Sequence, residues 1–263
     1  GTTTLSGTNT YTGTTTVSAG TLALGASNVI SNSSALVVNG GTFALGSYSD
    51  TVAAVTIGTS GGSITSTSGV LTGTSYTFNN SSSATVSAIL AGTANLEQAG
   101  SGTTTLSGTN TYTGTTTVSA GTLLITNDAG LGDTIAGTTV QSGATLDLHG
   151  VAVGSEQVTL NGGTLKDVTS SLAGNVVLTA DSTISTNSGD TLTLTGVISG
   201  AYGITKTGAG SLVLTNTNTY TGTTTVSAGT LALSGTGSIA NSSSIINNAS
   251  FDISATTTGA SII

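Results

Sequence analysis

The sequence contains no cysteine, proline, methionine or tryptophan, and Lys166 and Lys206 are its only lysine or arginine residues. A chain without cysteine can form neither disulfide bridges nor thiolate zinc sites. Two lysines cannot make a basic face on a chain of net charge −8, which argues against nucleic acid as a partner. No apolar run reaches the roughly eighteen residues of a membrane-spanning helix, so we expect no membrane insertion by this segment.

The residues that are present are typical of β-structure. Charged residues make up only 5% and hydrophobic residues 36%, so the chain can bury a core beneath a surface of Ser, Thr, Asn and Gly. Thr, Val and Ile suit a pleated, half-buried surface, and the absence of proline suits fully paired strands. We therefore predict an all-β fold. Because the chain does not begin with Met and shows no signal peptide, we expect a mature or excised piece of a longer protein.

The stretch TNTYTGTTTVSAGTL occurs three times without change, at residues 8–22, 109–123 and 217–231. The similarity extends upstream, since residues 89–108 align without a gap to residues 197–216. The chain therefore divides into sequence modules 1–101 and 102–209 and a partial module 210–263. The identity of the three stretches indicates either recent duplication or a local role performed once per module.

A second, shorter period underlies the modules. The pattern apolar–x–x–Gly–Thr–apolar returns about every twenty residues, for example in VSAGTLAL at 17–24, VNGGTFAL at 38–45 and LNGGTLKD at 160–167. Alternation within TLAL places Leu22 and Leu24 on one side of a short strand. Glycines that can turn a corner stand just before such strands, at Gly20, Gly41, Gly143, Gly163 and Gly229. These features predict one continuous β-solenoid over residues 1–263, with roughly a dozen coils.

Residues 194–233 resemble the passenger-associated transport repeat, also called the autotransporter-associated β-strand repeat. The resemblance returns at 96–123 and rests on four elements in order: Gly208 and Gly210, Leu212 and Leu214, NTYTG at 218–222, and TTVSAGTL at 224–231. It implies a passenger region of a secreted bacterial surface protein, folded as a single-stranded right-handed parallel β-helix. It also implies export through the outer membrane, folding outside, and an extracellular or cell-surface location.

We predict that the repeated stretch is a structural motif. Its defining residues are a tyrosine, two glycines, a valine and a leucine per copy: Tyr11, Gly13, Val17, Gly20 and Leu22; Tyr112, Gly114, Val118, Gly121 and Leu123; Tyr220, Gly222, Val226, Gly229 and Leu231. The favoured interpretation of the tyrosines is that each ring covers an edge or packs at a corner with its hydroxyl in water. The alternative is a platform on which sugars stack.

Few other residues suggest chemistry. His149 is the only histidine, and we expect it to be exposed at a corner, because a catalytic histidine needs a nucleophile or an orienting partner. Asp147 could pair with it, but no nucleophile can be assigned. The stretch NDAGLGD at 127–133 holds fewer ligands than calcium needs and is predicted to be a loop. The sequence thus predicts no catalytic, cofactor-binding or metal-binding residues.

Runs of three threonines raise one further possibility. Regular threonine arrays on a flat solenoid face occur in ice-binding proteins, and such an array requires T-x-T in most coils. Here GTTTV is restricted to the three copies of the repeated stretch, so an ice-binding function is disfavoured.

The sequence favours a non-enzymatic structural stalk or fibre segment of a secreted surface protein. Such a segment can fold progressively after export, because each coil docks on the last, and its partners would be further copies of itself or adjoining solenoid modules. One alternative is an extracellular filament subunit that stacks end to end, since neither terminus carries an obvious cap. Another is an adhesin or glycan-binding passenger that binds host or neighbour-cell glycans. An enzyme is disfavoured, since enzymatic β-helices need carboxylate pairs and commonly an Arg or Lys base, and this chain has no arginine.

Overall fold

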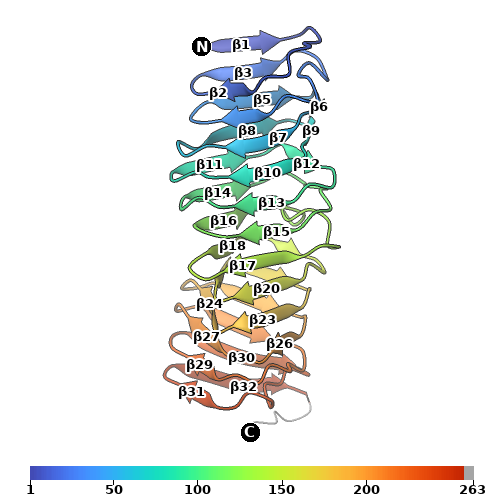
Figure 1. Cartoon of the computed structure of the whole chain (residues 1–263). Coiled ribbons are helices and arrows are strands. Elements are labelled where there is room, and N and C mark those ends of the chain that lie inside the picture. Colours follow the sequence, from blue (N-terminus) through green and yellow to red (C-terminus); the bar gives the residue numbers. More distant parts are fainter. Residues whose placement is uncertain (258–263) are drawn as a thin grey trace. The chain divides into compact units, whose positions relative to one another are not determined.

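A computed structural model describes residues 1–257, in which short strands are joined by loops (Figure 1). The chain divides into two compact units, Gly1–Ala136 and Gly137–Ile263. Over the described residues, no helix has the length and apolar character needed to span a membrane.

Unit 1 is built from three parallel sheets. The first stacks β1 (Thr2–Leu5), β3 (Thr21–Leu24), β5 (Thr42–Gly46), β8 (Gly62–Ser66), β11 (Ser83–Val86), β14 (Thr103–Leu106) and β16 (Thr122–Ile125). The second stacks β2 (Thr15–Val17), β4 (Leu36–Val38), β7 (Ala54–Ile57), β10 (Ser75–Phe78), β13 (Leu96–Gln98) and β15 (Thr116–Val118). The third holds β6 (Asp50–Thr51), β9 (Val70–Thr72) and β12 (Ile89–Ala91).

Unit 2 repeats this plan. One sheet stacks β18 (Thr145–His149), β21 (Thr164–Val168), β24 (Ser182–Thr186), β27 (Ile204–Thr207), β29 (Thr224–Val226) and β31 (Ile245–Asn247). Another holds β17 (Thr138–Gln141), β20 (Val158–Asn161), β23 (Val176–Ala180) and β26 (Ile198–Gly200). The last stacks β19 (Ala152–Val153), β22 (Ser170–Leu172), β25 (Thr191–Leu194), β28 (Ser211–Leu214), β30 (Thr230–Gly235) and β32 (Ser250–Thr256).

Within a sheet, each strand after the first lies on a strand of the previous circuit, although not every circuit contributes a strand to every sheet. Ser63 in β8 pairs in register with Thr85 in β11, 22 residues later, and their hydroxyls are 2.8 Å apart. In unit 2 the Val151 N–H donates to the Ser170 hydroxyl, 19 residues later. The period of about twenty residues and the prediction of an all-β solenoid are therefore confirmed. The division into sequence modules 1–101, 102–209 and 210–263, and the continuity of the solenoid over 1–263, stay predictions.

Alternation along each strand produces columns of buried side chains. In unit 1 one column runs in register through Val17, Val38, Ile57 and Phe78, each no more than 4% exposed. Full burial of a side chain of this size contributes about 1.5–3 kcal/mol relative to exposure. In a single isolated turn the apolar side chain of such a column would be uncovered above and below. The apolar core therefore forms only when turns stack.

The glycines before the strands act in two ways. Gly20, Gly143 and Gly229 have φ of 65°, 79° and 67°, the left-handed turn expected of a corner glycine. In the pairs Gly40–Gly41 and Gly162–Gly163 the positive φ belongs to the first glycine, and a β-carbon on Gly41 would lie 2.7 Å from the Val17 Cγ1 atom. The sequence-based expectation for Gly41 and Gly163 is thus wrong in its reason, because close packing on the previous turn requires those two glycines.

The repeated stretch is not tied to one sheet. In unit 2 the similar pattern VTLNGGTL lies on β20 and β21, whereas TTVSAGTL lies on β29 and β30. β29 belongs to the sheet of β21, and β30 belongs to the sheet of β28, so the pattern is shifted by one sheet. The same local sequence therefore forms the same strand–corner–strand unit at a different position around the cross-section. The motif is therefore held by its contacts with the neighbouring turns and does not require one particular sheet.

Candidate functional site

The asparagine of the repeated stretch joins its own turn to the turns on either side. The Asn110 side chain is 3% exposed, accepts the Leu90 N–H of the preceding turn at 2.9 Å and donates to the Gly130 carbonyl of the following turn at 2.7 Å. Asn218 makes the same bridge at 2.8 and 3.0 Å, between Ile198 and Ser238. A buried polar group left unpaired costs about 1–3 kcal/mol. A change in spacing that broke these hydrogen bonds would carry that cost, so the amides favour one distance between turns.

Two of the tyrosines are core residues. Tyr112 and Tyr220 are at most 1% exposed, and their hydroxyls lie 2.7 and 2.6 Å from the hydroxyls of Thr116 and Thr224. The Tyr112 ring also packs against Tyr76, with centroids 6.1 Å apart. Burial raises the pKa of Tyr220 to about 12, opposed by the Thr224 hydrogen bond. The expectation of hydroxyls in water is wrong here, because each finds a threonine four residues on, and neither ring is open to a stacking sugar.

Tyr11 makes the same hydrogen bond in a different setting. Its hydroxyl lies 2.7 Å from the Thr15 hydroxyl, but its ring is 40% exposed. No earlier turn covers it in this structure. Local geometry is therefore common to the three copies, and burial depends on the neighbouring turn.

The glycines of the repeated stretch permit close stacking of backbones. A β-carbon on Gly114 would collide with the Ala94 carbonyl, and one on Gly222 with the Tyr202 carbonyl carbon, whereas Gly13 has open space. Gly121 has φ of 60° and turns the corner as Gly20 and Gly229 do. The aliphatic residues point inward and are fully buried in the second and third copies: Val118, Leu123, Val226 and Leu231. Val17 is 4% exposed and Leu22 is half-buried.

A long polar side chain lies under each of these two covered copies. Gln98 is fully buried between Phe78 and Val118, and its amide donates to the Gly100 carbonyl at 2.8 Å. Lys206 is fully buried between Ile184 and Val226. Its ammonium donates to three carbonyls, at 2.7, 2.8 and 3.2 Å, those of Thr207, Gly208 and Ala228. Burial lowers the pKa of Lys206 to about 8.

The residues considered for catalysis do not converge on a site. His149 is exposed at the end of β18, as expected. Asp147 lies on the opposite face of the strand from Leu146 and Leu148, and its Oδ2 atom binds the Lys166 ammonium at 2.8 Å. The open alternative of an Asp147–His149 pair is therefore replaced by a salt bridge to the next turn.

The stretch 127–133 forms turns, as predicted. Asn127 Oδ1 accepts the Ala129 N–H at 3.0 Å, and Asp133 Oδ1 accepts the Ile135 N–H at 3.1 Å. Among residues 1–257, no group of three or more His, Cys, Asp or Glu side chains lies together in a way that could hold a metal ion.

Threonines form a single outward column in unit 2. Thr145, Thr164, Thr183, Thr205 and Thr225 stack in register, and Thr225 belongs to the third copy of the repeated stretch. The neighbouring column contains Asp147 and Lys166, which form an ion pair. A regular T-x-T array is therefore interrupted where the charges stand.

The residues that bind turn to turn were not predicted from the sequence. Asn110 and Asn218 stand two residues before Tyr112 and Tyr220, and an asparagine occupies this position in every copy, so the repetition was a usable signal. Gln98 and Lys206 align in the gapless upstream match, but their differing charge hid their shared role.

Comparison with protein families matches the passenger-associated-transport-repeat model to residues 1–24, 96–125 and 204–233. The chain is an autotransporter passenger segment built on these repeats. The matched segments contain the tyrosine, glycine corner and strand pair of all three copies, and the second and third also contain Gln98 and Lys206.

The passenger segment is also similar to the Adhesin BmaC autotransporter of Brucella suis biovar 1 (strain 1330), at 33% identity. The match covers 84% of this chain but only 6% of the length of that relative. No solved structure matches the chain.

Proposed function

We propose that this passenger segment is a non-enzymatic structural spacer of a secreted, surface-exposed protein. One observation carries the proposal: the polar groups of the repeated stretch are directed to adjacent turns. Asn110 and Asn218 bridge turns, and the hydroxyls of Tyr112 and Tyr220 are buried against threonines. The motif is identical in sequence in its three copies, and its polar groups point into the stack in the covered copies. This supports a role in holding the turns together.

The same contacts support folding turn by turn. Asn218 accepts the Ile198 N–H of the preceding turn, and its side-chain amide donates to Ser238 in the following turn as well as to Asn216 in its own turn. Each added turn thus completes polar groups of the last and covers its apolar column. A chain that emerges from a pore could fold in this order, which would oppose its return. Its partners would be adjoining solenoid modules or further copies of itself.

A deletion of residues 102–209 tests the spacer function. Gly102 and Gly210 are equivalent, since their carbonyls accept the N–H groups of Thr122 and Thr230 at 2.9 and 3.1 Å. Joining Ser101 to Gly210 therefore keeps the order of the repeat. The shortened passenger, with a reporter domain at its N-terminus, should be displayed on cells and resist protease as the full chain does.

A deletion of residues 102–199 is the control, because it places the wrong part of a turn at the junction. It should lose protease resistance. Loss of folding or display in the order-keeping deletion, or loss of a native binding activity that the deleted module alone supplies, would overturn the spacer function.

An adhesin function has separate support. The relative is named an adhesin, and three tyrosines are well exposed, Tyr11, Tyr48 and Tyr202, at 40%, 38% and 43%. Exposed aromatic rings are suited to stacking on sugars. Binding to a glycan array that disappears in the Tyr48→Ala or Tyr202→Ala variant, with folding unchanged, would favour this function. Filament formation, the other alternative, predicts particles that lengthen with concentration in electron micrographs.

A further inference from the structure

Three buried oxygen atoms in successive turns of unit 2 lack hydrogen-bond partners. They are both carboxylate oxygens of Asp167, on β21, and the hydroxyl oxygen of Thr186, on β24. The two residues pair in register, and both are fully buried. Buried polar atoms are nearly always satisfied in folded proteins, and a carboxylate can only accept hydrogen bonds. This corner therefore presents acceptors that no donor of the described chain completes.

Both side chains point into the interior. Alternation in β21 places Asp167 on the same side as the buried Leu165, and alternation in β24 places Thr186 on the same side as the buried Ile184. The backbones of neighbouring strands lie about 4.8 Å apart. An ion that bonds to oxygen at about 2.3–2.6 Å, as calcium does, fits between side chains at that spacing.

A second carboxylate lies at the same corner. Asp190 follows β24, and its Oδ1 atom accepts the hydroxyl of Thr169, two residues after Asp167, at 3.0 Å. Burial raises the pKa of Asp167 to about 6, and repulsion from Asp190 adds to this rise. The Ser170 hydroxyl donates to the Leu148 carbonyl at 3.1 Å. Because Asp190 is half-buried, an ion could reach the corner from solvent at this point.

The cationic side chains of the chain are engaged elsewhere. Lys166 binds Asp147 at 2.8 Å, and the Lys206 ammonium donates to three carbonyls. His149 is exposed at the end of β18, and the sequence contains no arginine. A charge that balances Asp167 would therefore have to come from solution.

The matching corner of unit 1 is satisfied by an amide. The N–H groups of Gly102 and Gly210, which are equivalent in the repeat, donate to the carbonyls of Asn80 and Thr186 at 2.8 and 3.1 Å. Asn80 therefore takes the place of Thr186. Its side chain donates to two carbonyls, at 2.7 and 3.1 Å, and accepts the Thr104 hydroxyl at 2.9 Å. Unit 1 thus closes this corner with its own donors, whereas unit 2 offers oxygen atoms without a nitrogen donor.

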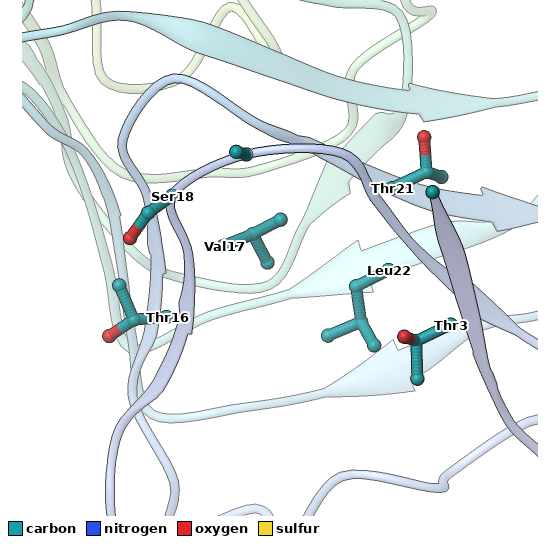
Figure 2. Close-up of a pocket in the computed structure, with 8 residues that line it drawn as sticks. Thr3, Thr16, Val17, Ser18, Thr21 and Leu22 are labelled. Atoms are coloured by element: carbon teal, nitrogen blue, oxygen red, sulfur yellow. The ribbon is translucent and has the colours of Figure 1, made fainter.

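A pocket of about 210 Å³ in unit 1 lacks the features of this corner. Figure 2 shows Val17 and Leu22 in it, with serine and threonine side chains around them. Its lining residues include no carboxylate, so it offers hydroxyl oxygens but no negative side chain to balance a divalent ion. The buried carboxylate, and not the size of a pocket, therefore locates the candidate ion site.

We propose that this corner of unit 2 binds one calcium ion through the carboxylates of Asp167 and Asp190 and the hydroxyl of Thr186. Backbone carbonyls and water would complete the roughly six to eight oxygen ligands that calcium takes. Two carboxylates suit the weak affinity of extracellular calcium modules, with a Kd of about 10⁻⁴–10⁻³ M. Such a site would bind calcium whether the segment acts as a spacer or as an adhesin.

Calcium titration of the full chain at about pH 7.5, after treatment with a chelator, tests the proposal. Equilibrium dialysis with radioactive calcium should find one bound ion that depends on Asp167. A Kd in the expected range predicts that about 10 mM calcium slows hydrogen exchange of the amides around β21 to β25 by about 10- to 100-fold, because the ion binds only the folded unit. Amides of unit 1 should change less.

Two variants remove single ligands and keep the shape of the corner. Asp167→Asn should weaken calcium binding by at least about tenfold, since calcium affinity follows the charge of the ligands, and Thr186→Val should weaken it by less. The matched control is Asp181→Asn, which removes an exposed carboxylate of unit 2 while its amide oxygen can still accept the Gly203 N–H. This control should bind calcium as wild type does.

Three outcomes would overturn the proposal. The first is no binding by the folded wild-type chain at about 10 mM calcium. The second is binding that Asp167→Asn leaves unchanged, or that Asp181→Asn weakens equally, since either would show attraction to the general negative charge only. The third is equal protection by magnesium, which demands a near-ideal octahedral site and should protect unit 2 less.

Discussion

Gln98 in unit 1 and Lys206 in unit 2 solve one packing problem with different chemistry. Each interrupts an apolar column, between Phe78 and Val118 in one case and between Ile184 and Val226 in the other. Each buries its hydrocarbon stem in the column and extends its nitrogen to corner carbonyls. What the position requires is therefore a long side chain with a donor at its tip. The charge is an additional property of unit 2, and its cost can be measured.

The largest effect should come from removing the donor. Lys206→Ala would leave three part-buried carbonyls without this donor and open a cavity, and we expect unit 2 to lose about 2–4 kcal/mol. Gln98→Ala should cost unit 1 less, about 1–3 kcal/mol, because its strongest hydrogen bond is to one carbonyl. Hydrogen exchange resolved by turn would locate each loss. A Lys206→Ala variant as stable as wild type would show that the lysine is not needed as a donor.

Asp167 sharpens the comparison, because it is a buried polar residue without the partners that Gln98 and Lys206 have. It lies in register between Leu148 and Thr186, and both of its carboxylate oxygens are buried without a completed hydrogen bond. Burial raises the pKa of Asp167 to about 6, helped by repulsion from Asp190 and opposed by the nearby Ser170. The folded chain therefore binds this proton more tightly than the unfolded chain does. The stability that the protonated form contributes is present at low pH and lost as pH rises through about 6.

Replacement of Asp167 should stabilise unit 2 at neutral pH. In Asp167→Leu the column continues from Leu148, and we expect a gain of about 1–3 kcal/mol at pH 7.5 that shrinks toward pH 4. Asp167→Asn is the control of similar size, which removes the charge but keeps a buried polar group, and should gain less. Chemical denaturation across this pH range would check both. A variant whose advantage is larger at pH 4 than at pH 7.5 would contradict the assigned burial of the charge.

Different parts of the structure could be predicted from the sequence to different degrees. The solenoid follows from alternation in segments such as 21–24 and from the period of about twenty residues, because both are local signals that stacking amplifies. The corner role of Gly20 could be predicted, but the packing role of Gly41 could not, since its close approach to Val17 is a contact between turns. For the same reason the sequence did not reveal the partners of Asn110, the packing of Tyr112 on Tyr76 or the contact of Lys206 with Ala228. They are set by which turn lies above and below, and that register is visible only in three dimensions.

The smallest effect at neutral pH, and the most direct test of the comparison, is Lys206→Gln. Glutamine would reproduce the unit 1 solution, so we expect a loss of no more than about 1 kcal/mol at pH 7, from the shorter reach to Ala228. Burial lowers the pKa of Lys206 from 10.5 to about 8, so between these values the unfolded wild type holds a proton that the folded protein releases. Wild-type stability should therefore rise with pH across that window, whereas Lys206→Gln lacks this rise. Unfolding midpoints of both proteins measured from pH 7 to pH 10 would show a gap that widens in favour of wild type. If the gap instead moved in favour of the glutamine variant as pH rose, the folded protein would hold the Lys206 proton more tightly than the unfolded chain. The hydrogen bonds to the three carbonyls, and not the loss of hydration on burial, would then determine the direction of the Lys206 pKa shift.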